Sequence, residues 1–126
     1  MVNVKIKLSG LWVAHMLSTT YADVLRLYDP GEVAASFPMT HELMLVSAIT
    51  MVIPIVMGVL SLTLKDKANR WANIIAGIFW VGYDLLMVTS AFSTAAPAYE
   101  IFLGFVYLIF ATPIVWYAWK WPKPEG

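Results

Sequence analysis

Apolar residues fill four long stretches of the chain, and short polar segments separate these stretches. A helix needs about 20 predominantly apolar residues to cross the hydrocarbon core of a bilayer. Each stretch reaches that length, so the pattern predicts four membrane-spanning helices. We expect these helices at residues 8–28, 41–64, 71–92 and 98–119.

The segments between the stretches carry ordinary turn and helix-end signals. Asp29-Pro30-Gly31 can end the first helix, and Thr40 can cap the second. Residues 65–70 form a polar link between the second and third helices, and Pro97 suits the first turn of the fourth. Such short connections place neighbouring helices antiparallel. We therefore predict a single domain, an all-α integral membrane protein folded as an antiparallel four-helix bundle.

Basic residues near the helix ends predict the orientation, because Lys and Arg concentrate on the cytoplasmic side of a membrane. Seven of the eight fall on one side, namely Lys5, Lys7, Lys65, Lys67, Arg70, Lys120 and Lys123. The other side has no lysine and carries Asp29, Glu32, Glu42 and Glu100. We therefore expect both termini in the cytoplasm and a multi-pass protein of the plasma membrane.

Composition supports the membrane class and excludes several others. Hydrophobic residues make up 60% of the 126 residues and charged residues 13%, whereas soluble domains carry about 25% charged residues. The absence of cysteine excludes disulfides, iron–sulfur clusters and a thiol nucleophile. No Gly-rich phosphate loop or basic face points to nucleotides or nucleic acid. The sequence predicts no cofactor and no metal site, since His15 and His41 lie at different depths.

Ionisable side chains within the predicted spans are the candidates for function, because such groups are costly in a bilayer and usually face the bundle interior. They are His15, Asp23 and Arg26 in the first helix and Asp84 in the third, with Glu100 at the outer rim of the fourth. Asp23 and Asp84 lie at nearly the same depth. We therefore hypothesise that these two carboxylates approach each other.

Structural roles are the alternatives for the same residues. Asp23 and Arg26 are three residues apart and can pair on their own helix. Asp84 has Arg26, a tyrosine or its own proton as expected partners. His15 is expected to bond to Thr19 or to a group of the fourth helix rather than to act as a ligand.

Helical phase places polar or small residues on one face of each predicted helix, since successive residues turn by about 100°. The four faces comprise His15, Thr19, Ala22 and Arg26; Ser47, Thr50, Pro54, Gly58 and Ser61; Asn73, Gly77, Trp80, Asp84 and Ala91; and Glu100, Gly104, Tyr107 and Ala111. If all four faces turn inward, they surround a partly polar space. Trp80, Tyr83 and Tyr107 would supply its aromatic contacts, although Trp80 also suits core packing. Trp12, Trp71 and the aromatic residues of 116–121 are expected at the cytoplasmic interface.

Four short runs resemble a known family. They are Tyr21-Ala22-Asp23-Val24-Leu25, Asp29-Pro30-Gly31, residues 67–74 and residues 116–120. Together they are similar to a family of small prokaryotic membrane proteins of unknown function. The resemblance covers essentially the whole chain. It implies a four-span protein of a bacterium or archaeon and implies no activity.

These features lead to one principal functional hypothesis: an outward-facing polar cavity that binds or transports a small amphipathic or cationic molecule. Asp23 and Asp84 would attract the molecule, and Arg26 would gate or neutralise them. The first alternative is a structural subunit or assembly factor of a larger membrane complex, which requires satisfied polar faces and no cavity.

A lipid- or isoprenoid-modifying enzyme is less favoured, because only the two aspartates could act as acid and base. Lipids are the expected partners. The small-residue ridge Ala14, Ser18 and Ala22 suits packing within the bundle or across a homo-oligomer.

Overall fold

A computed structural model describes residues 3–27 and 40–121, apart from the side chains of residues 26 and 27. These residues form four helices and no strand: α1 (Val4–Leu27), α2 (His41–Thr63), α3 (Asp66–Ser93) and α4 (Ala98–Trp119). Three of them, α2, α3 and α4, are long and apolar enough to span a membrane. The predicted all-helical membrane class is therefore confirmed. α1 is of similar length but is the least apolar of the four helices. That α1 spans the membrane stays a prediction.

The observed helices follow the predicted order, but two begin before the predicted spans. α1 begins at Val4 and α3 at Asp66, so most of the predicted polar link at residues 65–70 is helical. Charged residues are costly inside a bilayer but not in a helix that extends beyond it. Asp66 also lies in the first turn of α3, where the helix dipole stabilises a carboxylate. The predicted turn at Asp29-Pro30-Gly31 lies outside the described residues, as does the rest of the segment 28–39.

The predicted cap of α2 is present. Thr40 has an extended backbone, and its side-chain hydroxyl accepts a hydrogen bond from the Leu43 N–H at 3.1 Å. This bond satisfies one of the N–H groups that have no partner within the first turn of a helix.

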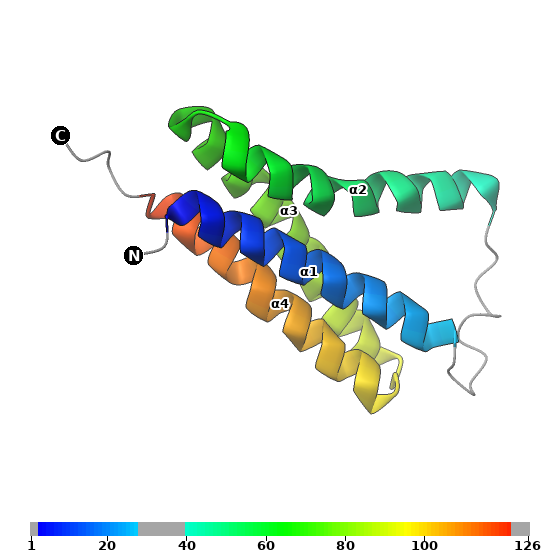
Figure 1. Cartoon of the computed structure of the whole chain (residues 1–126). Helices are drawn as coiled ribbons and strands as arrows, with labels where there is room; N and C mark the ends of the chain where they lie inside the picture. The colour runs from blue at the N-terminus through cyan, green and yellow to red at the C-terminus, as the bar shows by residue number, and fades with distance from the viewer. Residues whose placement is uncertain (1–2, 28–39, 122–126) are drawn as a thin grey trace.

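The four helices form a bundle that is closed at one end and splayed at the other (Figure 1). α1 packs against α2 and α4, and α3 packs most extensively against α4, whereas α2 and α3 have only limited contact. Figure 1 shows the first half of α2 diverging from the other helices, and residues 41–49 are all exposed.

We call the closed end the basic end, because its described residues include most of the basic side chains. It contains the start of α1, the α2–α3 connection and the end of α4. Its basic residues are Lys5, Lys7, Lys65, Lys67, Arg70 and Lys120. We call the opposite, splayed end the open end.

Burial confirms most of the predicted inward faces. In α3 the buried residues include Asn73, Gly77, Trp80 and Asp84. In α4 they include Gly104, Tyr107 and Ala111. In α2 only Pro54, Met57, Gly58 and Ser61 are buried, so its inward face packs in its second half alone.

Trp12 lies in the core rather than at the cytoplasmic interface predicted from the sequence. It is fully buried against Leu8, Met57, Trp80 and Ile114. Its indole Nε1 donates a 2.7 Å hydrogen bond to Asn73 Oδ1. The polar edge of the indole is thus satisfied by an asparagine of another helix instead of by the headgroup region. Trp71, by contrast, is exposed near the start of α3.

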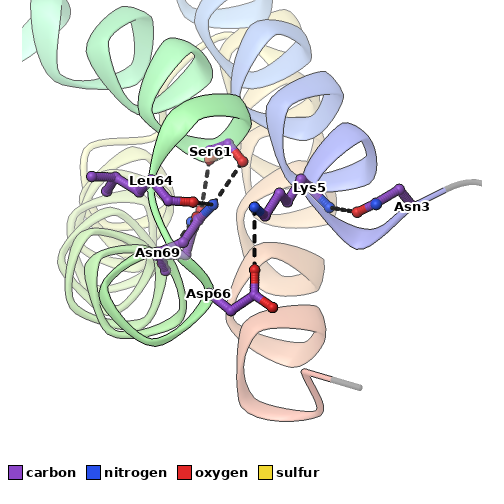
Figure 2. A network of polar contacts seen from close by, with 7 residues as sticks. Asn3, Lys5, Ser61, Leu64, Asp66 and Asn69 are labelled. Atoms are coloured by element: carbon purple, nitrogen blue, oxygen red, sulfur yellow. Dashed lines mark hydrogen bonds and ion pairs between the residues drawn. The ribbon is translucent and has the colours of Figure 1, made fainter. Parts of the chain in front are cut away.

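A network of amides ties the basic end together. Asn73 Nδ2 donates to Asn69 Oδ1 at 2.7 Å, and Asn69 Nδ2 donates to the Ser61 carbonyl at 2.7 Å. Figure 2 shows the Asn69 side chain bridging to the end of α2, with the 3.2 Å ion pair between Lys5 and Asp66 nearby. Arg70 Nε donates to the Ala118 carbonyl at 3.2 Å, which satisfies a group at the end of α4.

Two glycines allow the close approach of α3 and α4. A Cβ on Gly77 would lie 2.8 Å from Val115 Cγ2, and one on Gly104 would lie 2.7 Å from Val88 Cγ2. Both distances are shorter than carbon atoms tolerate. Any larger residue at either site would therefore force the facing valine, or the helix that carries it, to move.

We expect Gly104→Ala to lower the free energy of unfolding by about 1–3 kcal/mol, the typical cost of overpacking a core. Gly82→Ala is the matched control. Gly82 lies on α3, one of the same two helices, and a Cβ there would meet nothing within 4 Å. Thermal unfolding in detergent micelles, followed by circular dichroism, measures both. Equal melting temperatures for the two variants would contradict this account of the α3–α4 contact.

Candidate functional site

A histidine and an aspartate meet in the interior of the bundle. His15 Nε2 of α1 lies 2.8 Å from Asp84 Oδ2 of α3. His15 is 0% exposed and Asp84 1% exposed. An isolated charge or polar group at such a place would be costly, so each side chain needs the other as a partner.

Both residues lie on the inward faces predicted from the sequence, but their contact with each other was not predicted. Thr19 or a group of α4 was the expected partner of His15; the Thr19 hydroxyl instead donates to the Met16 carbonyl at 2.9 Å. The expected partners of Asp84 were Arg26, a tyrosine or a proton of its own, and these stay predictions, since the Arg26 side chain lies outside the described residues. Counting residues from the ends of the predicted spans places His15 and Asp84 at different depths in the membrane. Such counts equal depth only where helices start at one level and run parallel.

Aromatic rings surround the imidazole of His15. The ring centroids of Trp12, Trp80 and Tyr107 lie 6.4, 5.0 and 6.1 Å from the centroid of His15, all in edge-to-face geometry. These rings come from three different helices and shield the His15–Asp84 pair from the surroundings. The pair is therefore positioned by packing as well as by its hydrogen bond.

Two buried nitrogens of this cluster have no hydrogen-bond partner among the described residues. They are His15 Nδ1 and Trp80 Nε1. Trp80 is 3% exposed, so neither nitrogen is satisfied by bulk solvent. A buried donor without a partner typically costs about 1–3 kcal/mol, and native proteins contain few of them.

A cavity of about 300 Å³ adjoins this cluster, between α1, the first half of α2 and α3. Trp80, Asp84 and Tyr107 form its inner wall. Ser47, Thr50 and Met51 contribute from α2. Thr19, Asp23 and Tyr83 complete the lining together with Val46 and Met87.

The cavity brings together most of the site residues predicted from sequence. Asp23, Trp80, Tyr83, Asp84 and Tyr107 all line it. Asp23 and Asp84 therefore share one cavity, although Asp23 is exposed and Asp84 is buried against His15.

Three predicted residues stand apart from the lining. His15 lies behind the inner wall, in contact with Asp84 and Trp80. Glu100 is half-buried in the first turn of α4 and does not line the cavity. Arg26 belongs to α1, but its side chain lies outside the described residues.

Several lining residues gave no functional signal in the sequence. Thr19, Ser47 and Thr50 belong to predicted inward faces, so helical phase did place them. Met51 and Met87 are apolar residues in apolar helices, and only a known helix arrangement identifies them as cavity walls. Within the described part of the chain, no three His, Asp or Glu side chains gather closely enough to hold a metal ion.

Comparison with known proteins assigns the chain to a family. The model of DUF6326, a family of unknown function, matches residues 2–125, and the chain belongs to this family. The resemblance drawn from the sequence to a family without an assigned activity is thereby confirmed. No curated protein matches the chain. No solved structure matches it either.

We expect the His15–Asp84 pair to show strong coupling in a double-mutant cycle. His15→Phe and Asp84→Leu should each lower the free energy of unfolding by about 3–5 kcal/mol, because each leaves the other group buried without its partner. The double variant should lose much less than the sum of the two. Thermal unfolding in detergent micelles measures the cycle. Additive losses would contradict an interaction between the two side chains.

Proposed function

We propose that this member of DUF6326 is a membrane protein that binds a small amphipathic molecule in the cavity between α1, α2 and α3. The observation that carries the proposal is the inner wall: a cavity of about 300 Å³ reaches Trp80, whose buried indole nitrogen has no partner among the described residues. The volume falls at the lower end of the usual range for small-molecule sites, about 300–1,000 Å³.

The lining suits a molecule with one polar and one apolar part. Val46, Met51 and Met87 offer apolar contacts, while Thr19 and Thr50 offer hydroxyl groups. Methionine side chains adapt to ligands of varied shape. Residues 41–49 of α2 are all exposed, so the cavity lies beside a helix segment that would contact lipid. A ligand could therefore enter from the bilayer.

The packing beyond the cavity supports binding rather than passage through the bundle. Leu8, Trp12 and Ile114 are fully buried, and they fill the interior toward the basic end. The amide network of Asn69 and Asn73 lies at the same end. A molecule in the cavity would have to displace this packed core to reach the other side.

A second candidate function is the assembly of a larger membrane complex. Large apolar residues of α2, including Leu43, Met44, Leu45 and Ile49, are exposed and unpacked against the rest of the chain. A partner protein could cover them. This function alone leaves the cavity and the unpaired Trp80 nitrogen unexplained, whereas ligand binding accounts for both.

We expect a photoactivatable dodecanol carrying a diazirine to label cavity residues of the wild-type protein in lipid nanodiscs. Unlabelled dodecanol should compete. Ser47→Trp should abolish the competed labelling, because the added indole fills the cavity. Val59→Trp is the matched control, since Val59 is exposed on α2 and does not line the cavity. Peptide mass spectrometry measures the labelled positions.

Labelling spread evenly over exposed residues such as Phe102 and Ile109, with no effect of competitor, would show contact with bulk lipid only. That result would refute a binding cavity. Loss of competed labelling in both tryptophan variants would show that the effect does not depend on the cavity.

The orientation is part of the same proposal: the basic end faces the cytoplasm, as the distribution of Lys and Arg favours. The chain has no cysteine, so single cysteines can report the side. We expect a membrane-impermeant maleimide to label Thr94→Cys, in the α3–α4 connection, in intact cells. Lys67→Cys, at the basic end, should react only after permeabilisation. The reverse pattern would invert the topology.

A further inference from the structure

The two unpartnered nitrogens of the site lie on adjacent rings. The centroids of His15 and Trp80 are 5.0 Å apart, and neither His15 Nδ1 nor Trp80 Nε1 has a hydrogen-bond partner among the described residues. Trp80 Nε1 is a donor only, because the indole nitrogen has no free lone pair. Any group that satisfies it must therefore be an acceptor.

The role of His15 Nδ1 follows from the bond on the other side of the ring. Nε2 and Asp84 Oδ2 share one proton across 2.8 Å. If the pair is net neutral, it is either imidazolium and carboxylate or imidazole and carboxylic acid. In both arrangements Nδ1 carries a hydrogen and is a donor. A net-neutral pair also leaves no uncompensated charge in the interior.

The inner wall therefore contains one unpaired N–H donor, that of Trp80, and a carboxyl group whose charge His15 balances from behind the wall. A cation gains little there, because the negative charge of Asp84 is already compensated. Asp23, the other carboxylate of the lining, is exposed and already takes part in an interaction of its own. An anion gains little for the same reason, because the net-neutral pair offers no uncompensated positive charge. The chemistry favours a neutral oxygen acceptor.

We infer that the cavity recognises an uncharged amphiphile with a carbonyl oxygen, which accepts a hydrogen bond from Trp80 Nε1. The inference rests on the proposed function and narrows it to a class of ligand. The apolar part of the molecule lies between Met51 of α2 and Met87 of α3.

The indole N–H resonances test this assignment directly. The chain has six tryptophans, so protein labelled with ¹⁵N-tryptophan gives six indole signals, and Trp80→Phe identifies the one from Trp80. We expect 2-dodecanone to move that signal downfield in a saturable manner, since the indole gains an acceptor. Dodecane, which lacks the acceptor, and dodecyltrimethylammonium, which carries a positive charge, should leave it in place.

A competition measurement supplies an independent readout. The concentration of 2-dodecanone that halves the photolabelling should rise about fivefold in Trp80→Phe, as expected for the loss of one hydrogen bond. Trp71→Phe is the matched control, because Trp71 is exposed and does not line the cavity. It should leave the competition unchanged.

The outcomes separate the ligand class from the proposed function. Competed labelling in the cavity without a response of the Trp80 signal to 2-dodecanone would overturn the inference and leave the binding function standing. A response to dodecyltrimethylammonium in place of the ketone would do the same and would assign a cationic ligand. The absence of any competed labelling in the wild-type protein would overturn both.

Discussion

A polar side chain inside a membrane bundle must find its hydrogen-bond partner within the protein, because the surrounding hydrocarbon offers none. This constraint determines how α1 and α3 face each other. His15 bonds to Asp84 and Trp12 bonds to Asn73, so two buried contacts join the same two helices at two levels. A rotation or a shift of either helix would break both bonds at once. The register of α1 against α3 is therefore fixed by polar chemistry rather than by apolar contact alone.

The two contacts differ in how completely the buried polar groups around them are hydrogen-bonded. Toward the basic end, Asn73 accepts from Trp12 and Ser61 and donates to Asn69, which in turn reaches the Ser61 carbonyl. Nearer the open end, the His15–Asp84 pair leaves two nitrogens of its surroundings without partners among the described residues. The satisfied network coincides with close packing and the incomplete one with a cavity. Structural and functional tasks are thus divided along the length of the bundle.

Much of this arrangement was predictable from the sequence. The lengths of the apolar stretches gave the four helices, and helical phase gave their inward faces, including Trp80, Asp84 and Tyr107. The partners of the buried groups were not predictable. A helical face states which residues turn inward but not the height at which a residue on another helix meets them. His15 and Asp84 were therefore recognised separately, and their contact was not.

Trp12 shows a second reason. An indole near a predicted helix end suits an interface belt as well as a core, and only the neighbouring Asn73 decides between them. Asp23 and Arg26 show a third, since a charged pair at the end of a span has the same spacing whether it is structural or functional. Positions of this kind require the spatial arrangement of the helices.

Only the second half of α2 is packed against the rest of the chain, and this affects the width of the cavity. Ser9 Oγ donates to the Gly58 carbonyl at 2.8 Å, and buried residues secure the second half of this helix. Pro54 removes one backbone hydrogen bond between the secured half and the exposed half. The exposed half is thus anchored only through its junction with the packed half, and the lateral pressure of the acyl chains acts on its unpacked part. The width of the cavity is then a joint property of the protein and its bilayer, so thicker or more tightly packed lipid would narrow it without any change in sequence.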